Sequence, residues 1–176
     1  NQRFRGYEEH KRPITQAVVI CMLDVSGSMA DERTKFIARS LFFWTSRFLK
    51  KRYERLILRY IIHPGNTAPA ELVKEEDAIR MKMEGTTFSH TAFDLMQEIV
   101  RTQYPTNKYD VYGLYVSDGD DFDMDKTEKS IAKLIDSDIA MLAYAEVHVS
   151  AYQAKSGKLY ARLLNKFSLT EKRVKS

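Results

Sequence analysis

Three hydrophilic residues follow the first long apolar segment of the chain at alternate positions. Asp24, Ser26 and Ser28 come directly after the apolar segment 17–23, and Gly27 lies between the two serines. A turn that contains glycine has the conformational freedom to bring one carboxylate and two hydroxyls to a common point. All three groups are hard oxygen donors, which suit Mg²⁺, Mn²⁺ or Ca²⁺ better than metals that prefer thiolate ligands. The pattern therefore predicts a site for a divalent cation.

Two other parts of the chain supply matching oxygen donors. Gly85 and Thr86 lie between two predicted elements, and Asp118 closely follows a second apolar segment, 111–116. An alternative interpretation is that Asp24 and Asp118 cap the helices that come after them. Capping by itself does not account for three separate segments with matching donors, so we favour the metal site.

These segments resemble a known domain type. The sequence DVSGSM of residues 24–29, together with Gly85-Thr86 and the sequence SDG of residues 117–119, resembles a von Willebrand factor A domain with a metal-ion-dependent adhesion site. A narrower resemblance, to the bacterial UPF0229 (DUF444) family, extends from about Arg3 to Val147. Glu84 is a departure, because the family's loop tends to carry a second glycine before Gly85. The segments that carry the narrower resemblance are 3–5, Pro13, 16–19, 22–29, 38–44, 48–49 and 117–120.

The resemblance implies roles for the residues of this site. Ser26, Ser28 and Thr86 would coordinate Mg²⁺ or Mn²⁺ directly, while Asp24 and Asp118 would hold the ion directly or through water. An aspartate or glutamate of a partner protein would complete the coordination. Thr87 is an adjacent alternative to Thr86. Residues expected to support the site or to contact the partner are Gly27, Gly85, Thr87, Gly119, Asp120 and His63.

The same resemblance implies a biological setting. It points to a cytoplasmic bacterial protein in a stress or sporulation pathway, with a PrkA-type serine kinase or a SpoVR-type protein as the partner. The implied function is protein binding and not catalysis.

The alternative function is that of a Mg²⁺-dependent phosphohydrolase or phosphotransferase that uses Asp24 as its nucleophile. Such enzymes carry a second aspartate two positions later, where this chain has Ser26, and no phosphate-binding Gly-Lys-Ser/Thr loop is present.

Composition is that of an ordinary globular domain. The 176 residues are 44% hydrophobic and 30% charged, with a formal net charge of +4 and a pI near 9.0. The single cysteine, Cys21, cannot form an internal disulfide, which fits a reducing compartment. No apolar run reaches the roughly 20 residues of a membrane span, and no signal peptide opens the chain. The first residue is Asn1, so we expect a piece of a longer protein.

The basic segment 47–55 has two interpretations. It could contact phosphate or nucleic acid, or it could be the solvated end of a helix whose dipole it complements. We favour the second interpretation, because no aromatic stacking platform or known nucleic-acid motif accompanies the charges. His63 ends a predicted strand and also has two interpretations, one structural and one functional. We favour a loop histidine with a hydrogen bond over a direct contact with a partner.

Apolar segments alternate with amphipathic ones along the chain. This order predicts an α/β fold with a doubly wound, mostly parallel sheet and helices on both faces, as in von Willebrand factor A and Rossmann-like domains. We expect a lead-in segment at 1–16, one domain at 17–170 and a tail at 171–176, with 75–83 ambiguous between helix and strand. The predicted strands are 17–23, 56–62, 67–74, 108–117 and 139–147. The predicted helices are 34–53, 127–136, 152–167 and one that follows the segment 85–89 and runs through about Gln103.

A strand order of 3-2-1-4-5 would place Asp24 and Asp118 on neighbouring strands, at the switch point where such sheets bind ligands. The predicted helix 34–53 carries its own apolar stripe. Its members are spaced for one helical face, which we expect to pack on the sheet. They are Ile37, Leu41, Trp44 and Phe48, widened by Phe36 and Phe43.

Overall fold

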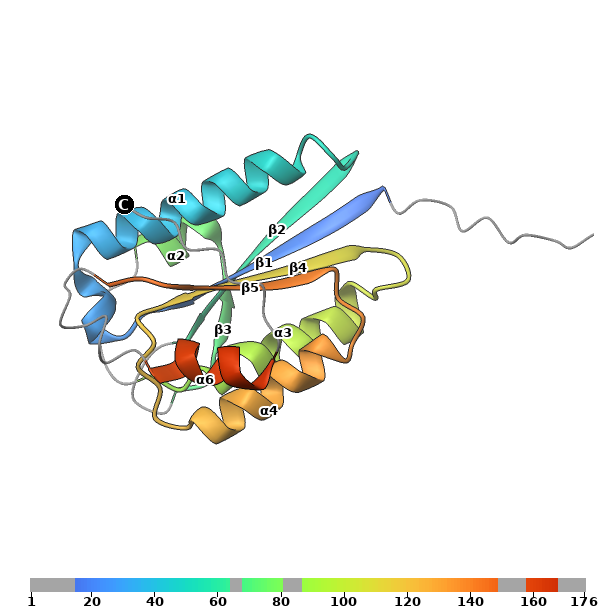
Figure 1. Cartoon of the computed structure of the whole chain (residues 1–176). Helices are drawn as coiled ribbons and strands as arrows, with labels where there is room; N and C mark the ends of the chain where they lie inside the picture. Colours follow the sequence, from blue (N-terminus) through green and yellow to red (C-terminus); the bar gives the residue numbers. More distant parts are fainter. Residues whose placement is uncertain (1–14, 64–67, 81–86, 149–157, 168–176) are drawn as a thin grey trace, which may run out of the picture.

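β1 (Gln16–Asp24) is the central strand of a five-stranded sheet (Figure 1). The computed structural model describes residues 15–63, 68–80, 87–148 and 158–167. β1 is buried from Ala17 onward, because an apolar strand without polar alternation can be covered on both faces. It pairs in parallel with β2 (Arg55–His63) on one side and β4 (Asp110–Ser117) on the other.

The sheet order is β3-β2-β1-β4-β5, which confirms the predicted order. β5 (Met141–Glu146) continues the parallel sheet beyond β4. β3 (Glu71–Val73) is a short edge strand that pairs with β2 in the antiparallel direction. The sheet is therefore mostly parallel, as the order of apolar segments predicted, and the carboxyl ends of β1 and β4 lie side by side.

Helices cover both faces of this sheet (Figure 1). One face carries α1 (Glu32–Leu49) and α2 (Glu75–Arg80), so the described part of the ambiguous segment 75–83 is helical. The chain between β1 and α1 forms a single 3₁₀ turn, η1 (Gly27–Ala30). The opposite face carries α3 (His90–Gln103), α4 (Met124–Ile135) and α6 (Lys158–Lys166).

Alternate residues of β1 pack into two hydrophobic cores, one on each face of the sheet. Ile20 and Met22 point toward the core that α3, α4 and α6 cover, while Val19 and Cys21 point toward the core beneath α1. Each such side chain contributes about 1.5–3 kcal/mol when it is fully buried. Burial raises the pKa of the Cys21 thiol, with a smaller contribution from Glu75, so this free cysteine is a packing residue.

The predicted inward stripe of α1 is wrong. Trp44 is 68% exposed and Phe48 is 60% exposed, and Phe36, Ile37 and Phe43 are exposed as well. The helix instead packs through Ala38, Phe42 and Leu49, while Leu41 is partly buried at the margin of that core. The helix has apolar residues on two faces, and its contacts with the strands select the face that carries the small Ala38.

The described helices include none that is long and apolar enough to cross a membrane. The predicted lead-in segment lies mostly outside the described residues, and the predicted tail lies entirely outside them. Their limits therefore stay predictions.

Candidate metal site at the carboxyl edge of the sheet

The Asp24 carboxylate is the centre of a hydrogen-bond network at the end of β1. Its side chain is fully buried. Oδ1 accepts a 2.8 Å hydrogen bond from the backbone N–H of Ser26, which closes the turn after the strand. Oδ2 accepts hydrogen bonds from the hydroxyls of Ser117, at 3.0 Å, and Thr87, at 3.2 Å. Three segments of the chain therefore orient one carboxylate.

The environment of Asp24 disfavours an isolated negative charge. Burial raises the pKa of this carboxyl, and Asp118 raises it slightly further, whereas His63 and the hydrogen bonds of Ser26 act in the opposite direction. In the described part of the chain, no Lys or Arg forms an ion pair with Asp24. A bound cation would supply the missing positive charge.

The two serines after Asp24 lie close together. Ser26 Oγ and Ser28 Oγ are 3.1 Å apart, with Ser26 buried and Ser28 exposed. Gly27, between them, is exposed and begins η1, and no heavy atom outside residues 26–28 lies within 4 Å of the position that a Cβ would take there. The pair therefore places one exposed and one buried serine hydroxyl side by side near the buried Asp24 carboxylate.

The loop after β4 supplies the next group. The Ser117 hydroxyl donates to Asp24 and also accepts a 3.1 Å hydrogen bond from the backbone N–H of Gly119. Asp118 is half-buried, and its Oδ1 accepts a 3.2 Å hydrogen bond from the backbone N–H of Asp120, which is exposed. Asp123, further along, caps α4 by accepting from Lys126 N–H. The N-cap of α4 is therefore Asp123 and not Asp118, which argues against the capping interpretation of Asp118.

Thr87 is the threonine that the described structure connects to Asp24. Gly85 and Thr86, predicted as part of the site, lie outside the described residues. Thr87 is buried, and its hydroxyl reaches both oxygens of Asp24, at 3.2 and 3.5 Å.

His63 lies behind the site. It ends β2 in register with Asp24, and only 1% of its surface is exposed, so it is too deeply buried to offer a partner a surface contact. The Tyr115 hydroxyl donates to Ser89 at 2.7 Å, and therefore accepts the 3.1 Å hydrogen bond from His63 Nε2. Burial lowers the pKa of His63, which favours the neutral ring. These hydrogen bonds connect β2 and β4 to Ser89 at the start of α3.

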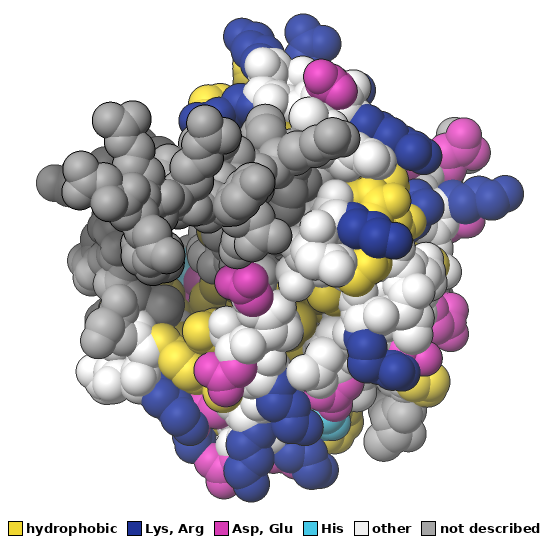
Figure 2. Space-filling model, turned by 90° about the vertical axis from the view of Figure 1, so that its right-hand side faces the viewer, with side chains coloured by type: hydrophobic (Ala, Val, Ile, Leu, Met, Phe, Trp, Pro, Cys, Tyr) yellow, Lys and Arg dark blue, Asp and Glu magenta, His cyan; other side chains and the backbone are white. Residues whose placement is uncertain are grey.

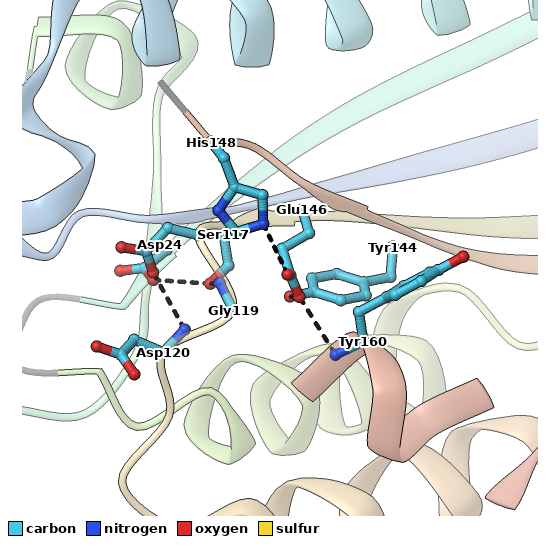
Figure 3. Close-up of polar contacts among 9 residues, drawn as sticks. Asp24, Ser117, Gly119, Asp120, Tyr144, Glu146, His148 and Tyr160 are labelled. Atoms are coloured by element: carbon cyan, nitrogen blue, oxygen red, sulfur yellow. Dashed lines mark hydrogen bonds and ion pairs between the residues drawn. The ribbon is translucent and has the colours of Figure 1, made fainter. Parts of the chain in front are cut away.

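Glu146, at the end of β5, was not predicted from the sequence. Its carboxylate accepts hydrogen bonds from the Tyr144 hydroxyl (2.8 Å) and the Tyr160 backbone N–H (3.2 Å), and it is 2.8 Å from His148 Nε2 (Figure 3). Gly119 has a φ of +86°, and a Cβ there would lie 2.3 Å from Glu146 Oε2. Glu146 therefore packs directly against the backbone of the loop after β4.

Neither Glu146 nor Ser117 was among the predicted site residues. Ser117 had a signal in the sequence, because it immediately precedes Asp118 in the motif that resembles the family. Glu146 had none, since its contact with Gly119 depends on the path of the loop after β4, which the predicted strand order does not specify.

The residues present fit a hydroxyl-based cation site. Neighbouring ligands of an octahedral Mg²⁺, at 2.0–2.1 Å from the ion, lie about 2.9 Å apart, close to the 3.1 Å between the Ser26 and Ser28 hydroxyls. The described residues contain no group of three or more His, Cys, Asp or Glu side chains that could hold a metal. A metal here would therefore depend on hydroxyl ligands, with the Asp24 carboxylate oriented behind them.

Comparison with known proteins identifies the family. The family described as "Protein of unknown function (DUF444)" matches residues 1–176. The chain belongs to the DUF444 family. A UPF0229 protein of Halalkalibacterium halodurans is 35% identical over 148 residues, which are 83% of this chain and 37% of that protein. A UPF0229 protein of Saccharophagus degradans is 34% identical over 154 residues, or 86% of this chain and 35% of that protein. This DUF444 chain thus spans little more than a third of the curated relatives it matches.

A solved structure supports the fold assignment. The manganese-loaded TRAP protein of Plasmodium vivax matches with a TM-score of 0.58 and 14% sequence identity, over 91% of this chain and 66% of that one. At this level of identity the similarity concerns the fold alone. The DUF444 chain therefore has a von Willebrand factor A-type fold, as its sequence motifs predicted.

Proposed function

We propose that this DUF444 chain is a metal-assisted protein-binding domain and not an enzyme. The observation that carries the proposal is the pair of Ser26 and Ser28 hydroxyls, 3.1 Å apart, at the edge of the sheet where Asp24 is buried and held by three donors. Oxygen ligands of this kind suit Mg²⁺ or Mn²⁺. The manganese-loaded TRAP structure supports the proposal, because a protein of the same fold binds such an ion.

Each group has a separate task in this proposal. Ser26, Ser28 and a threonine from position 86 or 87 would hold the ion. Asp24 would be kept in place by Ser117 and would neutralise the ion from behind, directly or through water. A bound ion supplies a positive, oriented coordination position, which an aspartate or glutamate of the partner would fill. Asp118 would add a second negative charge from the loop after β4.

The cellular setting is proposed from the family resemblance. It is a cytoplasmic role in bacterial stress or sporulation, with a PrkA-type serine kinase or a SpoVR-type protein as the partner. The basic charge of the chain does not favour nucleic acid as the partner, since no stacking platform accompanies it.

The phosphotransferase alternative is less well supported. A nucleophilic aspartate needs a carboxylate oxygen that substrate can reach. Asp24 has no exposed surface, and Ser26, Thr87 and Ser117 occupy its two oxygens. We therefore expect only background phosphatase turnover, and metal-dependent turnover that Asp24→Asn abolishes would overturn the binding proposal.

Calorimetric titration with Mg²⁺, Mn²⁺ and Zn²⁺, combined with a capture assay, tests the proposal. We expect Mg²⁺ or Mn²⁺ to bind with little preference for Zn²⁺, and Asp118→Ala to weaken that binding while circular dichroism stays unchanged. Capture of a purified PrkA-type kinase or SpoVR-type protein should need the ion and fall to the chelator level in Asp118→Ala. Asp136→Ala, an exposed aspartate at the end of α4, is the matched control. Tight Zn²⁺ binding that depends on His63, or equal capture by Asp118→Ala, would contradict the site.

A further inference from the structure

The outward face of α1 is unusually apolar for a helix surface. Five large apolar side chains lie on the side turned away from the sheet, and four of them are more than half exposed. Contiguous exposed patches of this kind mark interaction sites in soluble proteins. They are Phe36 (69% exposed), Ile37 (39%), Phe43 (55%), Trp44 (68%) and Phe48 (60%), and together we call them the α1 outer face.

The spacing along this face matches that of a helix seam. Ile37, Leu41, Trp44 and Phe48 follow one another at intervals of four, three and four residues, which is the a/d pattern of a heptad repeat. Leu41 is partly buried, and the other three residues are exposed. Such a row forms the ridge against which a second helix packs at a shallow crossing angle. The geometry of the face therefore favours a helical partner.

Apart from Glu32, which begins α1 and forms an ion pair with Lys35, the charged residues of this helix are all basic. Residues 33–53 contain seven Lys or Arg and no Asp or Glu. Two of these cations lie against the exposed rings: the Arg47 guanidinium is 5.8 Å from the centre of the Phe43 ring, and the Arg52 guanidinium is 5.8 Å from that of Phe48. In Figure 2, Lys and Arg side chains predominate along the upper edge, with some acidic and hydrophobic atoms among them, at the level at which α1 lies in Figure 1.

The positive charge indicates which kind of partner the α1 outer face can bind. A second copy of the chain would bring the same basic row against itself, and like charges across a helix seam are unfavourable. The terminal segments of this chain are also net basic, with four Lys/Arg against two Glu in residues 1–14 and three against one in 168–176. An acidic occupant complements the face in both charge and polarity.

We propose that the α1 outer face docks an acidic amphipathic helix of a partner protein. The apolar side of that helix packs along Ile37, Trp44 and Phe48, and its flanking carboxylates pair with the arginines that border the face. This interaction needs no metal, because the face runs along α1 away from the carboxyl edge of the sheet that holds Asp24 (Figure 1). It would give the domain a second contact surface in addition to the candidate metal site.

The fluorescence of Trp44 provides a direct test, since it is the only tryptophan of the chain. The probe is a synthetic heptad-repeat peptide with Leu at the a and d positions and Glu at the flanking positions. Its matched control carries Lys in place of Glu. We expect the acidic peptide to shift the Trp44 emission to shorter wavelengths and to protect it from acrylamide, equally with Mg²⁺ and with chelator. The basic peptide should leave the emission unchanged.

Variants locate the binding surface. Phe48→Ser changes an exposed ring and should leave the fold intact, yet it should weaken acidic peptide binding by about tenfold or more, as expected for an aromatic anchor. Ile135→Ser, at a 44% exposed apolar residue of α4, is the control and should bind like the wild type. No response to the acidic peptide, an equal response to both peptides, or unchanged binding by Phe48→Ser would overturn the proposal.

Two other occupants have distinct signatures. Vesicles of anionic phospholipid that shift the Trp44 emission, while the acidic peptide does not, would assign the face to a membrane surface. A dimer in sedimentation equilibrium that Phe48→Ser dissociates would assign it to a second copy. Either result would replace the helix-docking proposal. Because peptide binding is expected to survive Asp118→Ala, failure of this proposal is separable from failure of the metal site.

Discussion

The Ser117 hydroxyl donates a 3.0 Å hydrogen bond to Asp24 Oδ2, which joins the carboxyl ends of β4 and β1 across 93 positions of sequence. The same hydroxyl accepts from Gly119 N–H. One buried side chain therefore sets both the orientation of the central carboxylate and the path of the loop that carries Asp118. The candidate metal site depends on this bridge as much as on its predicted ligands.

Ser117→Ala should destabilise the fold and weaken metal binding together. It removes one of the two hydroxyl donors to Asp24 Oδ2 and leaves the Gly119 backbone N–H without its partner, which costs roughly 1–3 kcal/mol. Urea unfolding should show the loss in stability, and calorimetry should show weaker Mn²⁺ binding. Ser137→Ala, which removes a hydroxyl that donates to the Leu134 carbonyl, is the control for loss of a serine hydrogen bond. Unchanged Mn²⁺ affinity in folded Ser117→Ala would show that Asp24 needs no such support.

Gly119→Ala should be far more disruptive than Gly27→Ala. Position 119 has a φ of +86°, and the added Cβ would lie 2.3 Å from Glu146 Oε2, so both the backbone and the carboxylate must move. We expect a loss of roughly 1 kcal/mol or more in the free energy of unfolding. Gly27→Ala has open space around the new methyl and should change stability by about 0.5 kcal/mol or less. Differential scanning calorimetry of the two variants would detect the contrast, and equal Tm values would contradict the loop geometry.

Substitutions at the two adjacent threonines should separate a structural role from a coordinating one. Thr87 donates to Asp24 from a buried position, so Thr87→Val should lower stability by roughly 1 kcal/mol or more. Thr86 is the ligand that the family resemblance implies, so Thr86→Val should weaken Mn²⁺ binding. Denaturant unfolding and calorimetry on each variant measure both effects. If Thr86→Val binds Mn²⁺ like the wild type and Thr87→Val does not, Thr87 is the coordinating residue.

Glu128 of α4 should make a pH-dependent contribution to the stability of the fold, because it forms ion pairs with residues of α6. The buried Glu128 carboxylate is 2.6 Å from Lys166 Nζ and also pairs with Arg162. The hydrogen bond from Lys166 lowers the pKa of Glu128 below its ordinary value of 4.5, and Arg162 adds to the effect. Because the folded-state pKa is lowered, the stabilisation is present above about pH 4.5 and is lost as pH falls through the folded-state value.

Glu128→Gln should therefore be less stable than the wild type at pH 7, by roughly 1 kcal/mol given the exposure of its partners. The two proteins should converge in stability as the pH falls toward 3, a range that urea unfolding midpoints can follow. Glu98→Gln, at an exposed glutamate of α3, is the control and should track the wild type throughout. A constant difference between Glu128→Gln and the wild type over this range would exclude ionic stabilisation.

The pattern of apolar and amphipathic segments was enough to predict the architecture, and it predicts the edge of the sheet at which the candidate site lies. Continuous apolar runs such as 17–23 can only be covered on both faces of a sheet, and their alternation with amphipathic segments specifies a parallel α/β order. Asp24 and its serines lie at a strand end in any such arrangement. These features are local, so a pattern of neighbouring residues is enough to reveal them.

Which side chains meet, and which face of α1 turns inward, depends on the tertiary structure. The strand order was predictable, but the hydrogen bond from the Ser117 hydroxyl to Asp24 and the packing of Glu146 against Gly119 are contacts between side chains and loops that the strand order alone does not specify. On α1, one apolar row passes through Phe42 and another through Trp44, and helical periodicity fits both. Packing against the strands buried the row with the small Ala38. It left Trp44 and its neighbours in solvent, because a helix can lay only one side against a sheet.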